Sequence, residues 1–330
     1  MNLNQTQRGE NRVIGFLRDL VALLQFLAAC ALLLTFVARH WWLADLLANL
    51  RIQIIAGCAL LLLMACMTFD RRSLFPGIFL LLFAGWPLAG HMISHRLGDG
   101  SVSSNVDVPS ISICTINVLS GNRRMDDIAT AMVEHQPDVI AVLEVTSGHI
   151  HDLRTRFQTV YPYQWFRADD RGNFGIGLLS RIPFRTVQEV VFNDSRIPSV
   201  EAELQFSEAQ LLTLIATHTL PPMGPTAFAH RNQHLAMLAE HVVDTASRNP
   251  IVVVGDLNLT PWSPVYDDWL QNSGLNSALA GPYAFPTHTW YRFPSMLFGL
   301  CLDHCCATPD VQCSERHVSG DFGSDHRAVT

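Results

Sequence analysis

The stretch Ile251-Val252-Val253-Val254-Gly255-Asp256-Leu257-Asn258 is the part of the sequence that says most about the fold. Its first four residues are apolar and β-branched, which predicts a buried strand. An acid and an amide, Asp256 and Asn258, follow where that strand ends. Functional side chains gather on the loops that leave buried strands, so we expect both residues to belong to a functional site.

Other segments show strand and helix patterns on both sides of this stretch. Residues 111–118 alternate like a strand, 126–135 have helical spacing, and 138–143 form another apolar strand. Further strands are predicted at 176–179, 200–204, 211–217 and 302–307, and an amphipathic helix at 227–245. This alternation of strands and helices predicts an α/β domain.

The N-terminal part of the chain is much more apolar than the rest. Long apolar stretches cover 13–38, 52–69 and 74–94, and each is long enough to cross about 30 Å of hydrocarbon as a helix. We therefore expect a membrane domain of three transmembrane helices at 1–97. A Gly- and Ser-rich linker follows at 98–110, and a catalytic domain at 111–330.

Two features qualify the first span. Arg18 and Asp19 place its start near Leu20. Leu27-Ala28-Ala29-Cys30 resembles a lipoprotein processing site, but the chain stays apolar through Val37, which favours a membrane anchor over a cleaved signal.

Arginine positions predict the orientation in the membrane. Positive residues near the ends of spans stay in the cytoplasm, and Arg8, Arg12 and Arg18 precede the first span while Arg71-Arg72 separate the second from the third. Arg39 and Arg51, in the intervening loop, argue the other way. The balance predicts a multi-pass protein of the plasma (inner) membrane whose catalytic domain is periplasmic.

Composition excludes several classes of function. The 22 basic residues are all arginine, so a phosphate-loop lysine, a Schiff base and a pyridoxal enzyme are ruled out. From residue 105 onward, 14 Arg stand against 24 Asp and Glu, a formal net charge of −10. Because surfaces that track nucleic acid are normally basic, this balance argues against tight polynucleotide binding. No protein partner is implied.

A second short phrase, Ser324-Asp325-His326, places a carboxylate beside an imidazole. Together with the first phrase it suggests a centre that holds a divalent cation and stabilises a charged phosphate oxygen. The polar residues at or beside predicted strand ends are Asn117, Glu144, His218, Asp256, Asn258, Asp303, Asp325 and His326. The chemistry they predict is metal-assisted phosphoester hydrolysis.

The catalytic roles follow from side-chain chemistry. Asp256 is the best candidate to accept a proton from the attacking water, and Asn258 to hold that water or the phosphate in line. His218 and His326 can donate hydrogen bonds to the growing charge on the phosphate oxygens. Asp303 is expected to hold His326 in one tautomer and favour its protonated form.

The predicted metal ligands are Glu144, Asn117 and Asp325. Glu144 supplies a hard carboxylate oxygen of the kind that Mg²⁺ prefers, and Asn117 can orient the ion or a phosphate oxygen through its amide. Asp325 is expected either to bind the ion or to hold one of its ligands, and the sequence leaves open whether it or Asp303 touches the ion. Mg²⁺ is the expected cofactor, with Mn²⁺ an acceptable substitute.

At this point the sequence resembles the endonuclease/exonuclease/phosphatase (DNase I-like) superfamily. The matching phrases occur in the family's order: Thr115-Ile116-Asn117, Ala141-Val142-Leu143-Glu144, Gly175-Ile176-Gly177-Leu178-Leu179-Ser180-Arg181, Thr217-His218, Gly255-Asp256-Leu257-Asn258, Leu302-Asp303-His304 and Ser324-Asp325-His326. The resemblance implies a bacterial-type, membrane-anchored member in which two mixed β-sheets pack as a sandwich flanked by helices. Some nucleases of this family have an acid where this chain has Leu119, which favours a single metal ion here.

Three functions are compatible with these residues. The first is a membrane-anchored, Mg²⁺-dependent phosphatase or phosphodiesterase acting on a small or lipid-linked phosphate ester. Residues 290–298 are either an apolar lip that would suit a lipid or an ordinary buried loop, and the pattern favours the loop. The alternative is a membrane-bound endonuclease or exonuclease acting on DNA or RNA. A non-catalytic binding module is the third, but it predicts eroded site residues, which this chain does not have.

Cysteine usage leaves one point open. Cys301, Cys305, Cys306 and Cys313 lie close together near the C-terminal end, and their spacing is no zinc pattern. They are either small buried hydrophobic side chains or, if the domain faces an oxidising compartment, include one disulfide, whose connectivity does not follow from the sequence.

Overall fold

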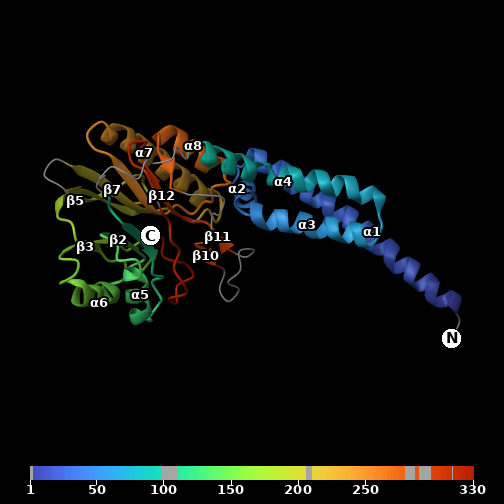
Figure 1. The fold of residues 1–330 in the computed structure, drawn as a ribbon, viewed down its shortest axis with the longest axis horizontal. Coiled ribbons are helices and arrows are strands. Elements are labelled where there is room, and N and C mark those ends of the chain that lie inside the picture. Colours follow the sequence, from blue (N-terminus) through green and yellow to red (C-terminus); the bar gives the residue numbers. More distant parts are fainter. Residues whose placement is uncertain (1–2, 99–109, 206–209, 279–286, 290–298, 314) are drawn as a thin grey trace. The chain divides into compact units, whose positions relative to one another are not determined.

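The computed structural model describes residues 3–98, 110–205, 210–278, 287–289, 299–313 and 315–330, and the chain forms two compact units. The first comprises Met1–Gly98 with Trp262–Pro264, and the second Asp99–Pro261 with Val265–Thr330 (Figure 1). The predicted apolar lip at 290–298 lies outside the described residues.

The first unit is helical. Its elements are α1 (Leu3–Leu34), the short helix η1 (Thr35–Val37), α2 (Trp42–Asn49), α3 (Arg51–Met67) and α4 (Arg71–Gly98). Leu32, Cys58, Leu80 and Ala84 form a small core where α1, α3 and α4 meet. Large apolar side chains such as Phe16, Phe26 and Phe79 point outward and are about two-thirds exposed. Large exposed apolar surfaces of this kind mark sites of interaction with a membrane or with another protein.

The expectation of three transmembrane helices is not met. Within the described residues, only Arg12–Val37 is a helix long and apolar enough to span a membrane. A second span would require that α2 and α3, which meet at a 67° bend, cross as one unit. The third predicted stretch lies in α4, which begins with Arg71-Arg72 and contains Pro76 and Pro87. These charges lower the hydropathy of its described part.

The second unit contains two mixed β-sheets. The smaller sheet has the strand order β1 (Ile113–Asn117), β2 (Val139–Leu143), β4 (Ile176–Ser180) and β3 (Tyr163–Arg167). The larger has the order β5 (Phe184–Val191), β6 (Pro198–Gln205), β7 (Leu211–His218), β8 (Ile251–Asp256), β12 (Asp303–Ala307) and β9 (Asn276–Ser277). The pairs β1–β2 and β7–β8 are parallel, and the others are antiparallel. A separate two-stranded antiparallel sheet pairs β10 (His288–Thr289) with β11 (Gly299–Leu300).

Apolar residues on alternate positions of the central strands build the core. In β2, Val139, Ala141 and Leu143 pack against Val252 and Val254 of β8, so the two sheets bury one face of each against the other. The intervening residues of these strands pack outward against helices. Because each central strand is covered on both faces, its sequence reads as a continuous apolar run.

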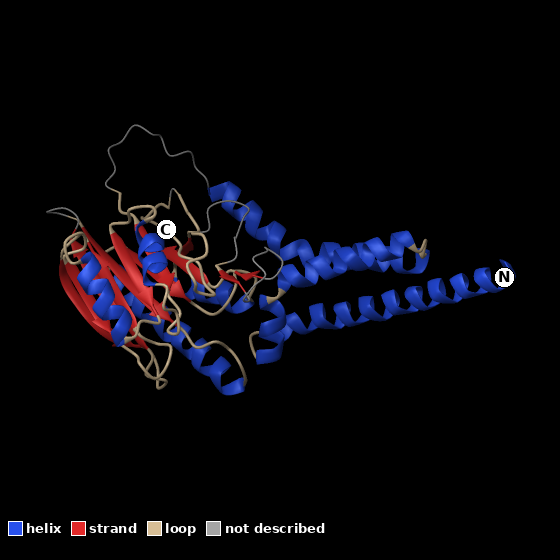
Figure 2. Cartoon of the chain, turned by 90° about the horizontal axis from the view of Figure 1, so that it is seen from below, coloured by secondary structure: helices blue, strands red, loops and turns tan. Residues whose placement is uncertain are grey.

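Helices cover the outer faces of this sandwich (Figure 2). Residues of α5 (Met125–Val133) and α6 (Ser147–Phe157) share a core with β1 and β2, and those of α7 (Pro225–Ala246) and α8 (Pro264–Ser273) share one with β7 and β8. The second unit is thus an α/β fold with two mixed sheets and flanking helices, as the resemblance implied.

Candidate active site

Strand register places three of the predicted site residues side by side. In the parallel pair β7–β8, His218 lies opposite Asp256, and in the antiparallel pair β8–β12, Asp256 lies opposite Asp303. The three residues therefore form a row across one edge of the larger sheet, and all three are buried. Residues that directly oppose one another in a sheet have Cβ atoms about 5 Å apart, so their side chains are held within reach of each other.

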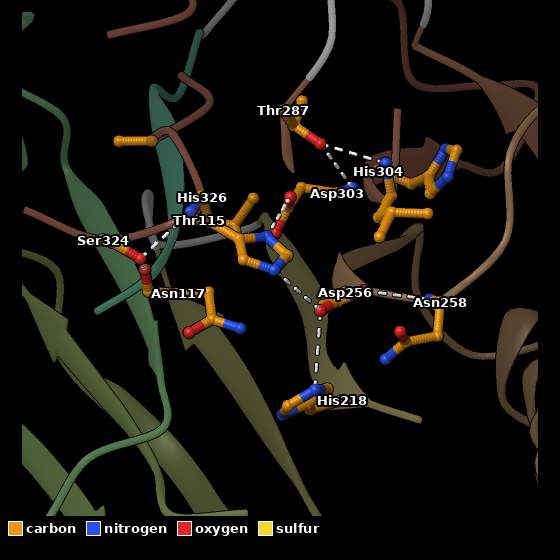
Figure 3. A network of polar contacts seen from close by, with 12 residues as sticks. Thr115, Asn117, His218, Asp256, Asn258, Thr287, Asp303, His304, Ser324 and His326 are labelled. Carbon is orange, nitrogen blue, oxygen red and sulfur yellow. Dashed lines mark hydrogen bonds and ion pairs between the residues drawn. The ribbon is translucent and has the colours of Figure 1, made fainter. Parts of the chain in front are cut away.

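The carboxylate of Asp256 lies between two imidazoles (Figure 3). Its Oδ2 is 3.4 Å from His218 Nε2 and 3.6 Å from His326 Nε2. Its Oδ1 accepts a hydrogen bond of 2.9 Å from the backbone N–H of Asn258. One oxygen is thus fixed by the backbone while the other faces the two histidines.

Asp303 supports His326 from the other side. Its Oδ2 is 2.8 Å from His326 Nδ1, so Nε2 of the same ring points toward Asp256. Thr287 fixes the start of β12, because its hydroxyl oxygen accepts hydrogen bonds from the backbone N–H groups of Leu302 and Asp303, each at 2.9 Å. The predicted orienting contact between Asp303 and His326 is therefore present in the structure.

The C-terminal segment that carries His326 is hydrogen-bonded to the smaller sheet. Val329 pairs with Thr115 of β1. Ser324 donates a 2.8 Å hydrogen bond to the carbonyl of Asn117 and accepts one from the backbone N–H of His326. These contacts bring the end of the chain to the strand ends of both sheets.

Burial and charge shift the pKa values of the site in opposite directions. Burial lowers the pKa of His218 to about 3, aided by the nearby His326. Burial would also lower the pKa of His326, but the carboxylates of Asp303 and Asp256 outweigh it and raise that pKa to about 10. At neutral pH, His218 is therefore the neutral imidazole and His326 the imidazolium.

The carboxylates respond to the same surroundings. Burial raises the pKa of Asp256 to about 8, opposed by the charge of His326. Burial acts on Asp303 in the same sense, yet its ion pair with His326 dominates and lowers its pKa. Burial also raises the pKa of Glu144. Burial therefore disfavours the charged forms of Asp256 and Glu144, which a neighbouring positive charge would restore.

The smaller sheet contributes Asn117 and Glu144. Asn117 ends β1, and Glu144 follows β2 with a left-handed backbone, φ 61°. The amide nitrogen of Asn117 donates to Glu144 Oε1 at 2.9 Å, and the backbone N–H of Ser120 donates to Oε2 at 3.2 Å. A left-handed conformation is uncommon for a residue other than glycine and often marks a functional position.

The side chains present fit a divalent cation. Glu144 offers buried carboxylate oxygens, the hard donors that Mg²⁺ prefers, and its charge acts on Asp256. Asp325 is half-buried beside His326, and its charge acts on Glu144. In this structure Asn117 holds the carboxylate of Glu144 through its amide nitrogen, while its oxygen accepts from the backbone N–H of Leu119. The ligand assignments of Glu144, Asn117 and Asp325 stay predictions.

Among the described side chains, a group of possible metal ligands other than the predicted one lies close together. Asp256, Asp303 and His326 offer ligand atoms within 4.8 Å of one another. In this structure Nδ1 of His326 is bonded to Asp303, Nε2 faces Asp256, and the two carboxylates favour the charged form of the ring. We interpret the trio as a proton-handling and charge-stabilising group.

Arg231 is a site residue that the sequence did not reveal. It lies on α7, its side chain is fully buried, and Nη1 donates a 3.1 Å hydrogen bond to the carbonyl of Asn258. Asn258 itself has a left-handed backbone, φ 49°, and its amide nitrogen donates to the carbonyl of Thr219 at 2.8 Å. Since an arginine in an amphipathic helix is usually a surface residue, no local signal indicated this contact.

Replacing Asp303 with asparagine should move the pH dependence of the site. Without its main carboxylate partner, the pKa of His326 should fall, so the alkaline limb of kcat/KM should shift to lower pH.

The same pair links stability to pH: a histidine whose pKa is raised on folding stabilises the protein fully below about pH 6.5, and this contribution is lost as pH rises toward 10. In Asp303→Asn, the free energy of unfolding should fall less steeply as the pH rises.

Both effects can be measured as pH profiles of kcat/KM and of thermal unfolding between pH 6 and pH 10. The exposed Asp321, which pairs only loosely with Arg124 at 3.6 Å, provides a matched control. Asp321→Asn should leave both profiles unchanged. An alkaline limb that stays in place in Asp303→Asn would exclude the proposed role of this carboxylate.

Replacing Arg231 with glutamine should lower kcat by about 10- to 100-fold with a much smaller change in KM, because Asn258 and the Asp256 carboxylate that it holds would shift by a fraction of an ångström. Arg231→Lys should recover part of the loss. Steady-state kinetics would test this, with Arg248→Gln, an exposed position just after α7, as control. If both variants lost the same fraction of kcat/KM, and the loss came from a higher KM with kcat unchanged, Arg231 would not act by positioning Asn258 and Asp256.

Comparison with known proteins identifies the class. A profile of the Endonuclease/Exonuclease/phosphatase family matches residues 114–326, well over half of the chain. The protein therefore belongs to this family, and it is a metal-dependent hydrolase of phosphoric ester bonds, as the row of acid and imidazole groups indicates. No curated protein sequence matches the chain significantly.

Solved structures share the fold of the second unit. The 3′ phosphatase NExo from Neisseria, bound to a product DNA hairpin, is 21% identical with a TM-score of 0.56, and the alignment covers 67% of this chain and 98% of that one. Sphingomyelinase C from Streptomyces griseocarneus is 21% identical with a TM-score of 0.53, at 67% and 98% coverage. An endonuclease/exonuclease/phosphatase from Beutenbergia cavernae is also 21% identical, with a TM-score of 0.56 and coverage of 66% and 70%.

Proposed function

We propose that the protein is a membrane-anchored, Mg²⁺-dependent phosphoesterase that hydrolyses a lipid-linked or small phosphate ester outside the cytoplasm. The observation that carries this proposal is the placement of Asp256 between His218 and His326, with Asp303 behind His326. A carboxylate that accepts a proton, flanked by two imidazoles, is suited to the in-line attack of water on phosphorus. In that reaction the water loses a proton and negative charge grows on the phosphate oxygens.

Each side chain has a distinct role in this reaction. Asp256, deprotonated once a bound cation lowers its raised pKa, accepts the proton of the attacking water through Oδ2, and Asn258 holds the water or the phosphate in line. His326, charged because of Asp303, donates to a phosphate oxygen and stabilises the transition state. His218, neutral at physiological pH, donates a hydrogen bond without adding charge.

The cation that fits this centre is Mg²⁺, with Mn²⁺ as a substitute. Glu144 and Asp325 would hold it through carboxylate oxygens, with Asn117 orienting Glu144. When bound, the ion neutralises charge on the phosphate and supplies the positive charge that the buried carboxylates lack. Leu119 stands where an additional acid would support a second ion, which favours a single-metal site.

Membrane anchoring rests on the helix at Arg12–Val37 and on the apolar surface of the helical unit. Arg8, Arg12 and Arg18 at its start favour a cytoplasmic N-terminus, so a single span would place the catalytic unit outside. A reporter fused to the C-terminus, active only in the periplasm, would test this orientation. Activity of a cytoplasm-specific reporter at the same position would reverse it.

Substrate preference separates the lipid phosphatase from the nuclease. The full-length protein in detergent should release phosphate from a polyprenyl phosphate with Mg²⁺, lose at least about 100-fold of this activity with a chelator, and recover it with added Mg²⁺. The formal charge of −10 after residue 105 predicts little activity on plasmid DNA. Phosphate release by the Asp256→Asn variant, purified in parallel, would reveal any activity that comes from contaminating hydrolases. Rapid cleavage of DNA without phosphate release from the lipid would favour the nuclease instead.

A further inference from the structure

The loop 169–174, between β3 and β4, lies beside the active site. The backbone N–H of Asp169 donates a 3.1 Å hydrogen bond to the carbonyl of Val145, and the N–H of Val145 donates one of 3.2 Å to the carbonyl of Gly175. Both ends of the loop are therefore bonded to the residue that follows Glu144. An added Cβ at Gly175 would lie 1.8 Å from the carbonyl oxygen of Val145, so this close approach requires glycine.

The carboxylate of Asp169 fixes the backbone of this loop. It accepts hydrogen bonds from the backbone N–H groups of Arg171, Gly172 and Phe174, at 3.1, 2.9 and 3.2 Å. A loop bonded in this way is ordered before a ligand arrives, so contacts with its side chains cost little conformational entropy on binding. The loop is therefore suited to contact a substrate.

Two side chains of the loop contact different parts of the active site. Asn173 Oδ1 accepts a 2.9 Å hydrogen bond from the hydroxyl of Ser120, whose backbone N–H donates to Glu144. The ring of Phe174 lies against that of His218, with 5.0 Å between the ring centroids and an angle of 46° between the planes. The loop therefore borders both the predicted metal ligand of the smaller sheet and the histidine that ends β7.

Phe174 combines this position with partial exposure. His218 is buried, whereas Phe174 is only half-buried, so this apolar residue is accessible beside the site. A single exposed aromatic residue elsewhere on the surface would need no explanation. This one contacts the histidine that is proposed to donate a hydrogen bond to the phosphate. Because the two rings are in contact, a phosphate ester bound at His218 would bring the carbons next to its ester oxygen close to the ring of Phe174.

We propose that Phe174 is a specificity-determining residue that selects phosphate esters of aliphatic alcohols, prenyl alcohols included, by covering their first few carbons. This inference rests on the proposed function and narrows its substrate class. A phenyl ring has no hydrogen-bonding group, so the hydroxyls of glycerol or of a sugar would lose bonds to water against it, whereas an alkyl chain loses none. Covering about 50 Å² of apolar surface favours binding by about tenfold.

Calorimetric binding of non-hydrolysable phosphonates to the full-length protein, in detergent and with Mg²⁺ present, tests the proposal. The ligands are hexylphosphonate, methylphosphonate and the phosphonate analogue of thymidine 5′-phosphate. Hexylphosphonate should bind the wild type about 10-fold more tightly than methylphosphonate. The nucleoside analogue places a polar sugar next to the phosphonate, so it should bind no more tightly than methylphosphonate.

Matched variants identify the contact. Phe174→Ala should reduce the preference for hexylphosphonate to within about twofold and leave the affinity for methylphosphonate unchanged, and Phe174→Leu should keep part of the preference. Tyr163→Ala is the control, because Tyr163 is an exposed aromatic residue paired with Ser180, at the other end of β4 from the loop. It should leave both affinities unchanged. Melting temperatures of all variants would confirm that they are folded.

Hydrolysis of hexyl phosphate and methyl phosphate by the same preparations separates this proposal from the proposed function. In Phe174→Ala, KM for hexyl phosphate should rise about 10-fold with kcat unchanged. Phosphonate binding with the expected preference, without hydrolysis of either ester, would contradict the proposed function and leave the binding role of Phe174 intact. The proposal would be overturned if the wild type bound none of the phosphonates or bound the two alkyl ligands equally. A preference that persists in Phe174→Ala, or tighter binding of the nucleoside analogue by stacking on the ring, would overturn it as well.

Discussion

Replacing Asp256 with asparagine should lower kcat by about 10³-fold or more, the largest loss expected from any single side chain in the site. The amide keeps the size of the carboxylate and its contact with the backbone N–H of Asn258, but it cannot accept a proton from water. It also removes the negative charge that lies between His218 and His326. Both the base and the electrostatic arrangement of the two imidazoles would therefore be lost.

Single-turnover kinetics on a phosphate ester substrate would measure this loss directly. Mg²⁺ affinity, measured by calorimetry on the same preparation, should remain close to that of the wild type, because Glu144 and Asp325 are the predicted ligands. Asp127→Asn, an exposed acid paired with Arg124, serves as control and should keep full activity. A variant that loses Mg²⁺ binding in proportion to kcat would make Asp256 a metal ligand and not the base.

Replacing Gly255 with alanine should destabilise the catalytic unit by about 3 kcal/mol, which corresponds to a fall in melting temperature of about 10 °C. Gly255 has φ 134°, a conformation that L-residues rarely adopt. A Cβ atom there would lie 1.9 Å from the carbonyl oxygen of Thr217 on the neighbouring strand, so the backbone of β7 or β8 would have to move. These two strands carry His218 and Asp256, and activity should fall as well.

Thermal unfolding of the full-length protein would report this loss, with Gly121→Ala as the matched control. Gly121 has open space around the added methyl group, and its backbone requires no positive φ. The control should change stability by no more than about 0.5 kcal/mol. A melting temperature of Gly255→Ala within a degree or two of the wild type would contradict this prediction, because it would show that β7 and β8 can move apart at little cost to make room for the methyl group.

Local patterns were sufficient to predict most of the central elements of the catalytic unit. The buried strands β1, β2, β4, β6, β7, β8 and β12 and the helices α5 and α7 were expected close to their observed positions. Strands covered on both faces are apolar along their length, and an amphipathic helix repeats its apolar residues every three to four positions, so both signals are strong within a short window.

Elements with weak local signals were missed. β5 is an edge strand with mostly exposed positions, and its sequence Phe184–Val191 mixes arginine, glutamine and glutamate with apolar residues. α6 (Ser147–Phe157) is largely polar, although Thr146 and His149 form a capping box at its start that could have indicated it. Fewer membrane spans than predicted are found among the described residues, because the second stretch belongs to a pair of helices bent by 67° and the arginines at the start of α4 lower the hydropathy of its described part.

Sequence order alone was enough to nominate the acid, amide and imidazole groups, because each one follows a strand or stands within a family phrase, and their roles stay predictions. Only the folded chain shows which of them meet. The register of β7, β8 and β12 sets His218, Asp256 and Asp303 in one row, and a C-terminal segment distant in sequence adds His326. Arg231 behind Asn258 and the backbone N–H of Ser120 on Glu144 had no sequence signal. Register and long-range hydrogen bonds depend on strand pairing across many residues, and no local pattern encodes a contact between distant segments.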